Sequence, residues 1–231
     1  MKENKVKWYG VVIGIVTALA QHGIYTLGNV IGQWVGITPY SPKIDCIDNL
    51  FVLLPVFIVP YVWSYLYWAM APMAVSKCEV GHFKNYLASY FWACAFGMVI
   101  LIFAPTYMDR TAEGLMDLPS GFFYDLMRLW YALDGGERAY NLLPSFHCIV
   151  STISFLGVYK RPEVPKWYRV YSLLLTVLIC LSTCFVKQHY VLDVVTGVTI
   201  ATVSYWICMK RNVGRMFDRP TAWLQRRLKK A

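Results

Sequence analysis

Six apolar stretches, each with few or no charged residues, divide this chain of 231 residues. Their approximate bounds are 8–33, 50–73, 85–105, 142–159, 167–186 and 189–209. A helix needs about 20 residues to cross the hydrocarbon core of a bilayer, and these stretches reach or approach that length. Charged residues make up 15% of the chain, against about 25% in a typical soluble domain. The sequence therefore predicts an all-α bundle of six transmembrane helices, and we expect residues 1–231 to form a single integral membrane domain.

Basic residues gather in alternate connections between these stretches. They precede the first stretch, separate the second from the third and the fourth from the fifth, and follow the sixth. They are Lys2, Lys5, Lys7, Lys77, Lys84, Lys160, Arg161, Lys166, Arg169, Lys210, Arg211, Arg215, Arg219, Arg226, Arg227, Lys229 and Lys230. Such a pattern places basic loops in the cytoplasm. We therefore expect a multi-pass protein of the cell membrane with both termini in the cytoplasm, and the net charge of +9 indicates topology rather than binding of nucleic acid.

The connection from residue 106 to residue 141 contains a further helical pattern. Its apolar residues recur at helical spacing, with Asp125 and Arg128 on the other face. The apolar residues are Phe122, Phe123, Leu126, Leu129, Trp130 and Leu133. We expect a helix within 119–133, between the third and fourth spans, lying at the outer membrane interface. It forms either a lid or lipid-entry wall beside a polar site, or only a cover for the top of the bundle.

Two polar clusters open the fourth and the sixth apolar stretches on the predicted outer face. The first is Pro144-Ser145-Phe146-His147, and the second runs from Lys187 to Asp193. His189 and Asp193 are four residues apart, so in a helix they share one face and the carboxylate can hold the imidazole in one tautomer. Helix N-termini favour anions, and Lys187 and Arg110 add positive charge at the same level. The pattern predicts a phosphate site with two histidines for nucleophilic and acid roles.

Other residues that commonly carry chemistry give weaker signals. We interpret His22, inside the first stretch, as a packed polar residue or a neighbour of a lipid channel. His82 lies in a basic loop, where we expect it to be solvated. Asp109 and Asp134 form no compact ligand motif with the histidines. We therefore expect neither a metal nor another cofactor.

Three segments together resemble the signatures of the type 2 phosphatidic acid phosphatase superfamily. Ala104 to Arg110 resembles the first, Pro144 to His147 the middle one, and Ser182 through His189 to Asp193 the last. In that family the final histidine attacks phosphorus to form a phosphohistidine, and the middle histidine protonates the leaving oxygen. The resemblance implies the following roles: His189 is the nucleophile, His147 the general acid, Asp193 the orienting carboxylate, and Arg110, Ser145 and Lys187 the ligands of the phosphate oxygens.

The chain departs from the family pattern at three positions. Phe103 and Thr111 stand where the first signature has a lysine and a proline, and Thr183 replaces the arginine of the last signature. Lys187 is a candidate substitute for one missing phosphate ligand, although a lysine is a point charge rather than a planar fork. With the run Gln188-His189-Tyr190, these differences resemble the branch that contains inositol phosphorylceramide synthases.

Our main hypothesis is a metal-independent membrane lipid phosphatase that hydrolyses a phosphomonoester or pyrophosphate lipid at the outer leaflet through a phosphohistidine. The substrate would be a phospholipid or a polyprenyl phosphate, and the sequence identifies neither the lipid nor the oligomeric state. One alternative is a lipid phosphotransferase that moves a phospho-headgroup to an acceptor alcohol. An alternative of another class is a lipid transporter whose histidines bind without reacting; transporters often carry inverted repeats, and the sequence has no such repeat.

Overall fold

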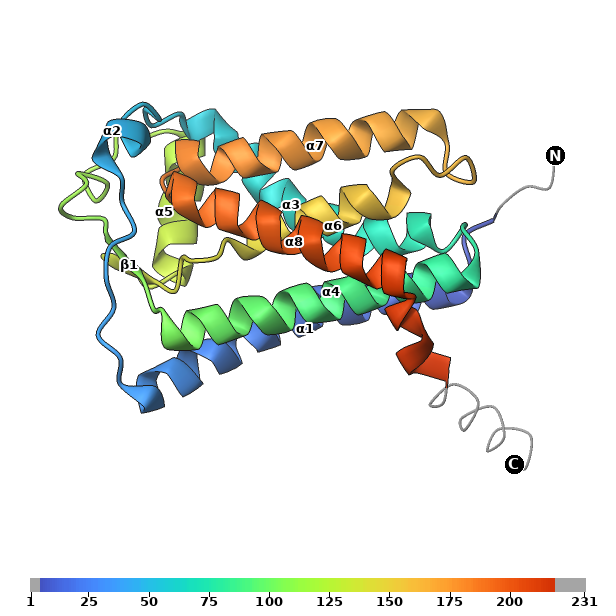
Figure 1. The fold of residues 1–231 in the computed structure, drawn as a ribbon. Helices are drawn as coiled ribbons and strands as arrows, with labels where there is room; N and C mark the ends of the chain where they lie inside the picture. The colour runs from blue at the N-terminus through green and yellow to red at the C-terminus, as the bar shows by residue number, and fades with distance from the viewer. Residues whose placement is uncertain (1–4, 219–231) are drawn as a thin grey trace.

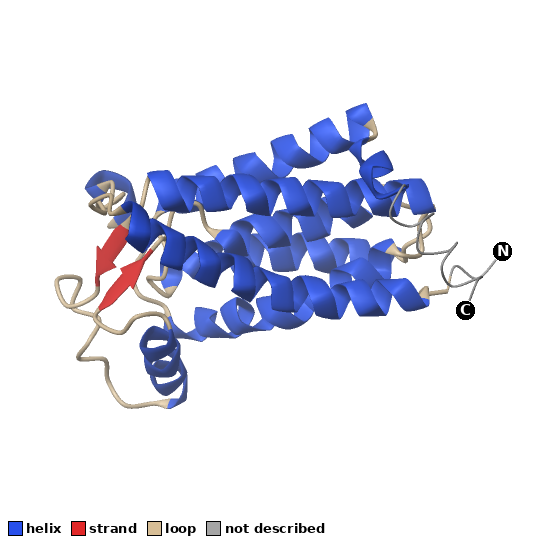
Figure 2. Ribbon diagram, turned by 90° about the horizontal axis from the view of Figure 1, so that it is seen from below, coloured by secondary structure: helices blue, strands red, loops and turns tan. Residues whose placement is uncertain are grey.

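The computed structural model describes residues 5–218, and most of this range is helical. Within it, six long helices lie side by side (Figure 1, Figure 2). They are α1 (Trp8–Val35), α3 (Ile58–Val75), α4 (Val80–Phe103), α6 (Phe146–Val158), α7 (Lys166–Phe185) and α8 (Val191–Arg211). The shorter elements are α2 (Asp45–Asp48), η1 (Pro55–Phe57), β1 (Tyr107–Asp109), α5 (Phe122–Leu133), β2 (Arg138–Tyr140) and η2 (Val213–Phe217).

Each predicted apolar stretch overlaps one of these six helices. Within the described residues, α1, α4, α7 and α8 are long and apolar enough to cross a membrane, while α6 has only 13 residues. Three predicted starts were wrong. Helix α4 begins at Val80 instead of residue 85. Helix α3 begins at Ile58 instead of residue 50, after a short 3-10 turn that Pro55 opens. Helix α6 begins at Phe146 instead of residue 142, because the side chain of Ser145 caps it by accepting a hydrogen bond from the backbone N–H of Cys148 at 3.4 Å.

Helix α6 occupies the centre of the bundle. It packs against α3, α4, α7 and α8, and nearly all of its residues are buried. Small residues permit the close approach of its neighbours. A Cβ on Gly197 of α8 would lie 2.6 Å from the carbonyl oxygen of Ser145, so the two helices meet where α6 begins. A central helix with contacts on all sides is held in position by packing rather than by its length.

The two ends of the bundle differ in charge. At one end, where α1 begins and α8 ends, lie the basic residues Lys7, Lys77, Lys84, Lys160, Arg161, Lys166 and Arg211. We call this the basic end. Lys2 and the basic residues after 218 lie outside the described range. The opposite end is covered by α2, α5, β1 and β2 (Figure 1), and we call it the cavity end. All three signature segments lie at the cavity end.

The cover of the cavity end is built from two long connections. Strands β1 and β2 are antiparallel and pair Tyr107 with Tyr140 and Asp109 with Arg138. Helix α5 lies across the bundle end (Figure 1), so the expectation of a helix within 119–133 is confirmed. It starts only at Phe122, because Gly121, with φ 149°, adopts a conformation that favours glycine. Its apolar side chains divide between the interior and the surface. Met127 packs inward, whereas Phe122 and Leu133 are more than 70% exposed.

Candidate active site

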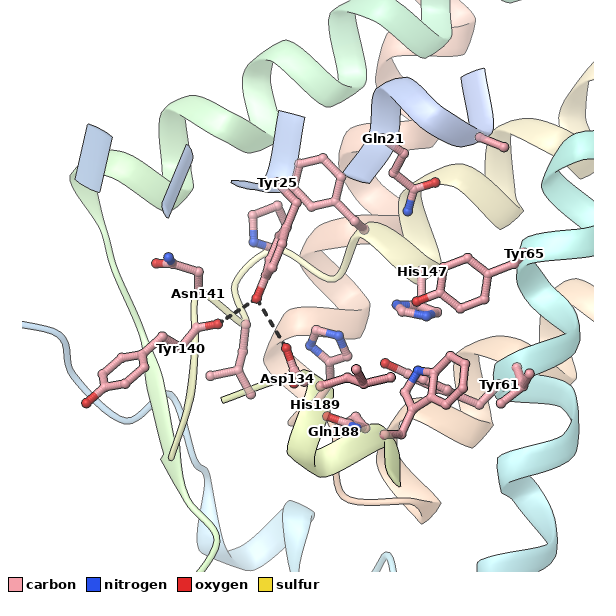
Figure 3. Close-up of a pocket in the computed structure, with 17 residues that line it drawn as sticks. Gln21, Tyr25, Tyr61, Tyr65, Asp134, Tyr140, Asn141, His147, Gln188 and His189 are labelled. Carbon is pink, nitrogen blue, oxygen red and sulfur yellow. Dashed lines mark hydrogen bonds between the residues drawn. The ribbon is translucent and has the colours of Figure 1, made fainter. Parts of the chain in front are cut away.

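A cavity of about 510 Å³ lies at the cavity end, bounded by α1, α3, α5 and the starts of α6 and α8 (Figure 3). Aromatic and polar side chains dominate its wall. The lining residues are Ala18, Gln21, Tyr25, Tyr61, Val62, Tyr65, Trp130, Leu133, Asp134, Tyr140, Asn141, Leu142, Pro144, Phe146, His147, Gln188 and His189. Within the described part of the chain, no lysine or arginine contributes to this lining. A phosphate in the cavity would therefore meet histidines, amides and hydroxyls, together with the carboxyl group of Asp134.

His189 and Asp193 form a pair at the start of α8. The Nδ1 atom of His189 lies 3.4 Å from Oδ2 of Asp193, and the Asp193 side chain is fully buried. The same oxygen accepts the backbone N–H of Tyr190 at 2.9 Å, which fixes the carboxylate at the helix N-terminus. Because Nδ1 faces the carboxylate, Nε2 of His189 faces the other way, toward the cavity that this residue lines. The expected proximity of the two residues is present, although Nδ1 of His189 makes no hydrogen bond at this distance. The expectation that both residues share a helical face was wrong, because His189 precedes Tyr190, the N-cap of α8.

His147 lies across the cavity from His189, with ring centroids 6.1 Å apart (Figure 3). Aromatic rings of α3 hold it: Tyr61 stacks on it at 4.2 Å, and Trp68 meets it at an angle at 5.0 Å. Its Nε2 atom is buried without a hydrogen-bond partner. An unpartnered buried nitrogen is uncommon in a folded protein, and here it faces a cavity with room for a polar group.

Arg110 lies behind the cavity wall, fully buried. Its Nη1 donates to the carbonyl oxygens of Tyr131, Asp134 and Gly136 at 2.7–3.2 Å. Its Nη2 donates to Oδ2 of Asp134 and to Oε1 of Gln188, both at 2.8 Å. The two terminal nitrogens are thus occupied by protein oxygens, while Nε is buried without a partner. Arg110 does not line the cavity, and it reaches the cavity through the side chains of Asp134 and Gln188.

The other two predicted phosphate ligands also lie outside the cavity lining. Ser145 is fully buried, and its hydroxyl caps α6. Lys187 has φ 52°, and its Nζ donates to the backbone carbonyl of Asp48 at 3.4 Å. The structure therefore brings His147, His189 and Asp193 together, while Arg110, Ser145 and Lys187 surround that group without facing its cavity.

A polar wall on the α1 side of the cavity was not anticipated. Asp134 accepts from Arg110 and lies 3.5 Å from the hydroxyl of Tyr25, which also donates to the carbonyl of Tyr140 at 3.0 Å. Burial raises the pKa of Asp134, and the positive charge of Arg110 opposes that shift. Gln21 lines the same wall, and its Oε1 is buried without a partner. This wall offers hydrogen-bond acceptors to whatever enters.

Two further histidines were considered from the sequence. His82 is buried within α4, and its Nε2 lies 2.8 Å from the carbonyl oxygen of Gly157, so the expectation that it is solvated was wrong. The charge pattern indicated a loop at this position, but His82 lies in the first turn of α4, which packs against the bundle. His22 falls within α1, but its side chain lies outside the described part of the structure.

Sequence reasoning missed Gln188, Asp134 as a cavity residue, and the aromatic rings of α3. Gln188 had a signal, since it precedes His189 directly. The α3 rings had none, because their contact with His147 depends on the packing of helices far apart in the chain. In residues 5–218, no three His, Cys, Asp or Glu side chains are grouped closely enough to hold a metal ion.

The fold and the site together define a class of protein. It is a helical, membrane-type protein whose end cavity holds two histidines and a buried carboxylate. The comparison with protein families then gives the family. The PAP2 superfamily matches residues 47–207, more than half of the chain, and the chain belongs to this superfamily. This range includes His147, His189 and Asp193.

Membership supports phosphatase-type activity on lipid phosphates in general, because PAP2 proteins are generally phosphoric ester hydrolases. The chain's apolar helices are compatible with a multi-pass membrane protein. A search of curated proteins and a search of solved structures each returned no match.

Proposed function

We propose that this protein is an integral membrane lipid phosphatase that hydrolyses a phosphomonoester or pyrophosphate lipid through a phosphohistidine on His189. The observation that carries the proposal is the placement of His189, oriented by Asp193, opposite His147 in one cavity. A phosphoryl group between the two rings would have a nucleophile on one side and an acid on the other. Family membership independently supports phosphatase-type chemistry.

In the first step, Nε2 of His189 forms a bond to phosphorus, and the bond from phosphorus to the lipid oxygen breaks. His147 donates its proton to that oxygen as it leaves, and the Asp193 carboxylate stabilises the positive charge that develops on the His189 ring. In the second step, a water molecule attacks the phosphohistidine, His147 accepts the proton of the water, and phosphate leaves. No step in this scheme requires a metal ion.

The proposal includes a membrane orientation. Six helices would cross the bilayer as one domain, the basic end would face the cytoplasm, and the cavity would open at the outer leaflet. Helix α5 contributes Trp130 and Leu133 to the cavity wall, while its exposed Phe122 and Leu129 would lie in the interface. This favours a lipid-entry wall over a mere cover, because one helix would contact both the lipid and the reacting group.

The test is release of phosphate by detergent-purified protein from phosphatidic acid, phosphatidylglycerol phosphate and a polyprenyl pyrophosphate, with chelator present. We expect release from at least one lipid and none from His189→Ala, together with phosphohistidine on rapidly quenched wild type. A His189→Ala protein with near-normal release would refute the mechanism. A folded wild type that binds lipid without forming phosphohistidine would favour a transporter.

One observation supports a second candidate, a lipid phosphotransferase. Asp134 and Gln21 present acceptor oxygens beside the histidines, and such oxygens suit the hydroxyl groups of an alcohol better than a phosphate anion. In this reaction the alcohol replaces water in the second step, and its proton passes to His147. Supplying candidate alcohols with the lipid panel separates the two functions: a transferase makes a new phospho-alcohol lipid, and a phosphatase releases only phosphate.

A further inference from the structure

Gln188, the residue before His189, is buried, and the side chain of Arg110 orients its amide. Only 2% of its surface is exposed. Nη2 of Arg110 lies 2.8 Å from its Oε1. A guanidinium can only donate hydrogen bonds, so the amide atom that faces Arg110 must be the oxygen. The amide nitrogen then points away from Arg110.

The nitrogen of this amide is unsatisfied. Nε2 of Gln188 is buried and has no hydrogen-bond partner, although leaving a buried donor unpaired costs about 1–3 kcal/mol. Gln188 lines the cavity together with His147 and His189, and Figure 3 places it beside His189. A donor fixed in this way is prepared for an acceptor that enters the cavity.

We infer that Gln188 is a catalytic residue whose Nε2 donates a hydrogen bond to an oxygen of the reacting phosphoryl group, and that Arg110 is the positioning residue that orients it. This inference rests on the proposed function. It assigns the role of phosphate ligand to a neutral amide, at the cavity surface, in place of the predicted arginine. Arg110 does not take that role directly, since it does not line the cavity and five oxygens of the protein already occupy its two terminal nitrogens. Its Nε is buried behind the wall without a partner.

The arrangement is also compatible with the Asp134 side chain in the cavity wall. A guanidinium inside the cavity would pair with the nearby Asp134 carboxylate and compete with substrate. An amide carries no charge, so it can donate to a phosphoryl oxygen without attracting Asp134. Fixed donors directed at developing charge contribute a large part of enzymatic rate enhancement, and the loss of one typically costs about 100-fold or more in turnover.

The test measures binding of orthovanadate, which mimics the pentacoordinate phosphoryl group and needs no knowledge of the lipid. Vanadium NMR on purified wild type is compared with Gln188→Glu and Gln188→Met. The glutamate keeps an oxygen for Arg110 but removes the donor, while the methionine removes both. Gln33→Glu is the matched control, because Gln33 is exposed at the end of α1 and receives the same added charge outside the cavity. Thermal unfolding establishes that each variant is folded.

We expect wild type and Gln33→Glu to bind vanadate alike, and both Gln188 variants to bind it at least 10-fold more weakly while staying folded. If a lipid substrate is in hand, their turnover should fall by about 100-fold or more with little change in KM. Folded Gln188 variants that bind vanadate as tightly as wild type would overturn the inference and leave the histidine mechanism intact. A folded wild type that binds no vanadate would overturn the proposed function itself.

Discussion

The ring of Tyr61 lies nearly parallel to the ring of His147, with an interplanar angle of 22° and centroids 4.2 Å apart. The tyrosine belongs to α3 and the histidine to α6, so the contact fixes the proposed acid by packing between two helices. Removing the stack should misplace His147 relative to the leaving oxygen. We expect Tyr61→Leu to lower turnover by about 10- to 100-fold, as measured by phosphate release, while Tyr61→Phe stays close to wild type. Equal losses in the two variants would assign the effect to the hydroxyl instead.

Asp193 and Asp48 both accept hydrogen bonds near the start of α8, but only Asp193 contacts His189. Oδ1 of Asp48 accepts the backbone N–H of Val191 at 2.8 Å. We expect Asp193→Asn to lower the rate of phosphohistidine formation by about 10²- to 10⁴-fold, because an amide can hold the wrong tautomer of the imidazole and cannot stabilise its positive charge. The measurement is rapid quenching after mixing with lipid.

Asp48→Asn is the control for the Asp193 variant. It weakens the cap of the same helix, so it should lower the unfolding temperature while sparing phosphohistidine formation. A similar loss of rate in both variants would mean that the start of α8, rather than the carboxylate of Asp193, limits the reaction.

Asp134 should make stability depend on pH. Burial raises its pKa from the ordinary value of 3.8, so between that value and the raised one the folded state holds a proton that the unfolded state has released. The free energy of unfolding must then fall as pH rises through this window. Asp134→Asn does not titrate. We therefore expect the unfolding free energy of wild type minus that of Asp134→Asn to decrease from about pH 4 upward, as measured in detergent. An increase would mean that the ion pair with Arg110 outweighs burial.

Gly197 sets the closest approach of α6 and α8. A Cβ there would lie 2.6 Å from the Ser145 carbonyl oxygen, a backbone atom that cannot move aside alone. We expect Gly197→Ala to separate the two helices, lower the unfolding temperature and reduce turnover. Gly81→Ala is the matched control, since a Cβ at Gly81 in α4 meets no atom within 4 Å. It should be neutral or stabilising, by up to about 1 kcal/mol. A stable, fully active Gly197→Ala would contradict this account of the contact.

The sequence was a good guide wherever a feature depended on neighbours along the chain. The six helices followed from apolar length. The contact between His189 and Asp193 was expected from their separation of four residues, but His189 lies before α8 and not on a shared helical face. The surroundings of Arg110 did not follow, because its partners Tyr131, Asp134, Gly136 and Gln188 come from two distant segments that meet only in the folded cover. A charged residue in a sequence indicates which groups it can bind, but not which buried oxygens will lie beside it in the fold.

The position of α3 was equally hidden. Its tyrosines and tryptophans fit any aromatic helix at a membrane interface, and only the packing of α3 on α6 directs Tyr61, Tyr65 and Trp68 toward His147. Orientation within a bundle depends on side-chain volumes across several helices at once. A single sequence does not tell which side chains of different helices meet.

His189 directly precedes the N-cap of α8, the helix that contains Asp193, whereas His147 belongs to α6. A change in the separation of α6 from α8 would therefore change the distance of the proposed acid from the proposed nucleophile and its carboxylate. The N–H of Ser145 donates to the carbonyl oxygen of Asp193 at 3.1 Å, so a backbone hydrogen bond clamps this coordinate at the level of the reacting groups. A substitution that displaces this hydrogen bond would therefore move the two proposed catalytic groups apart even where it touches neither histidine.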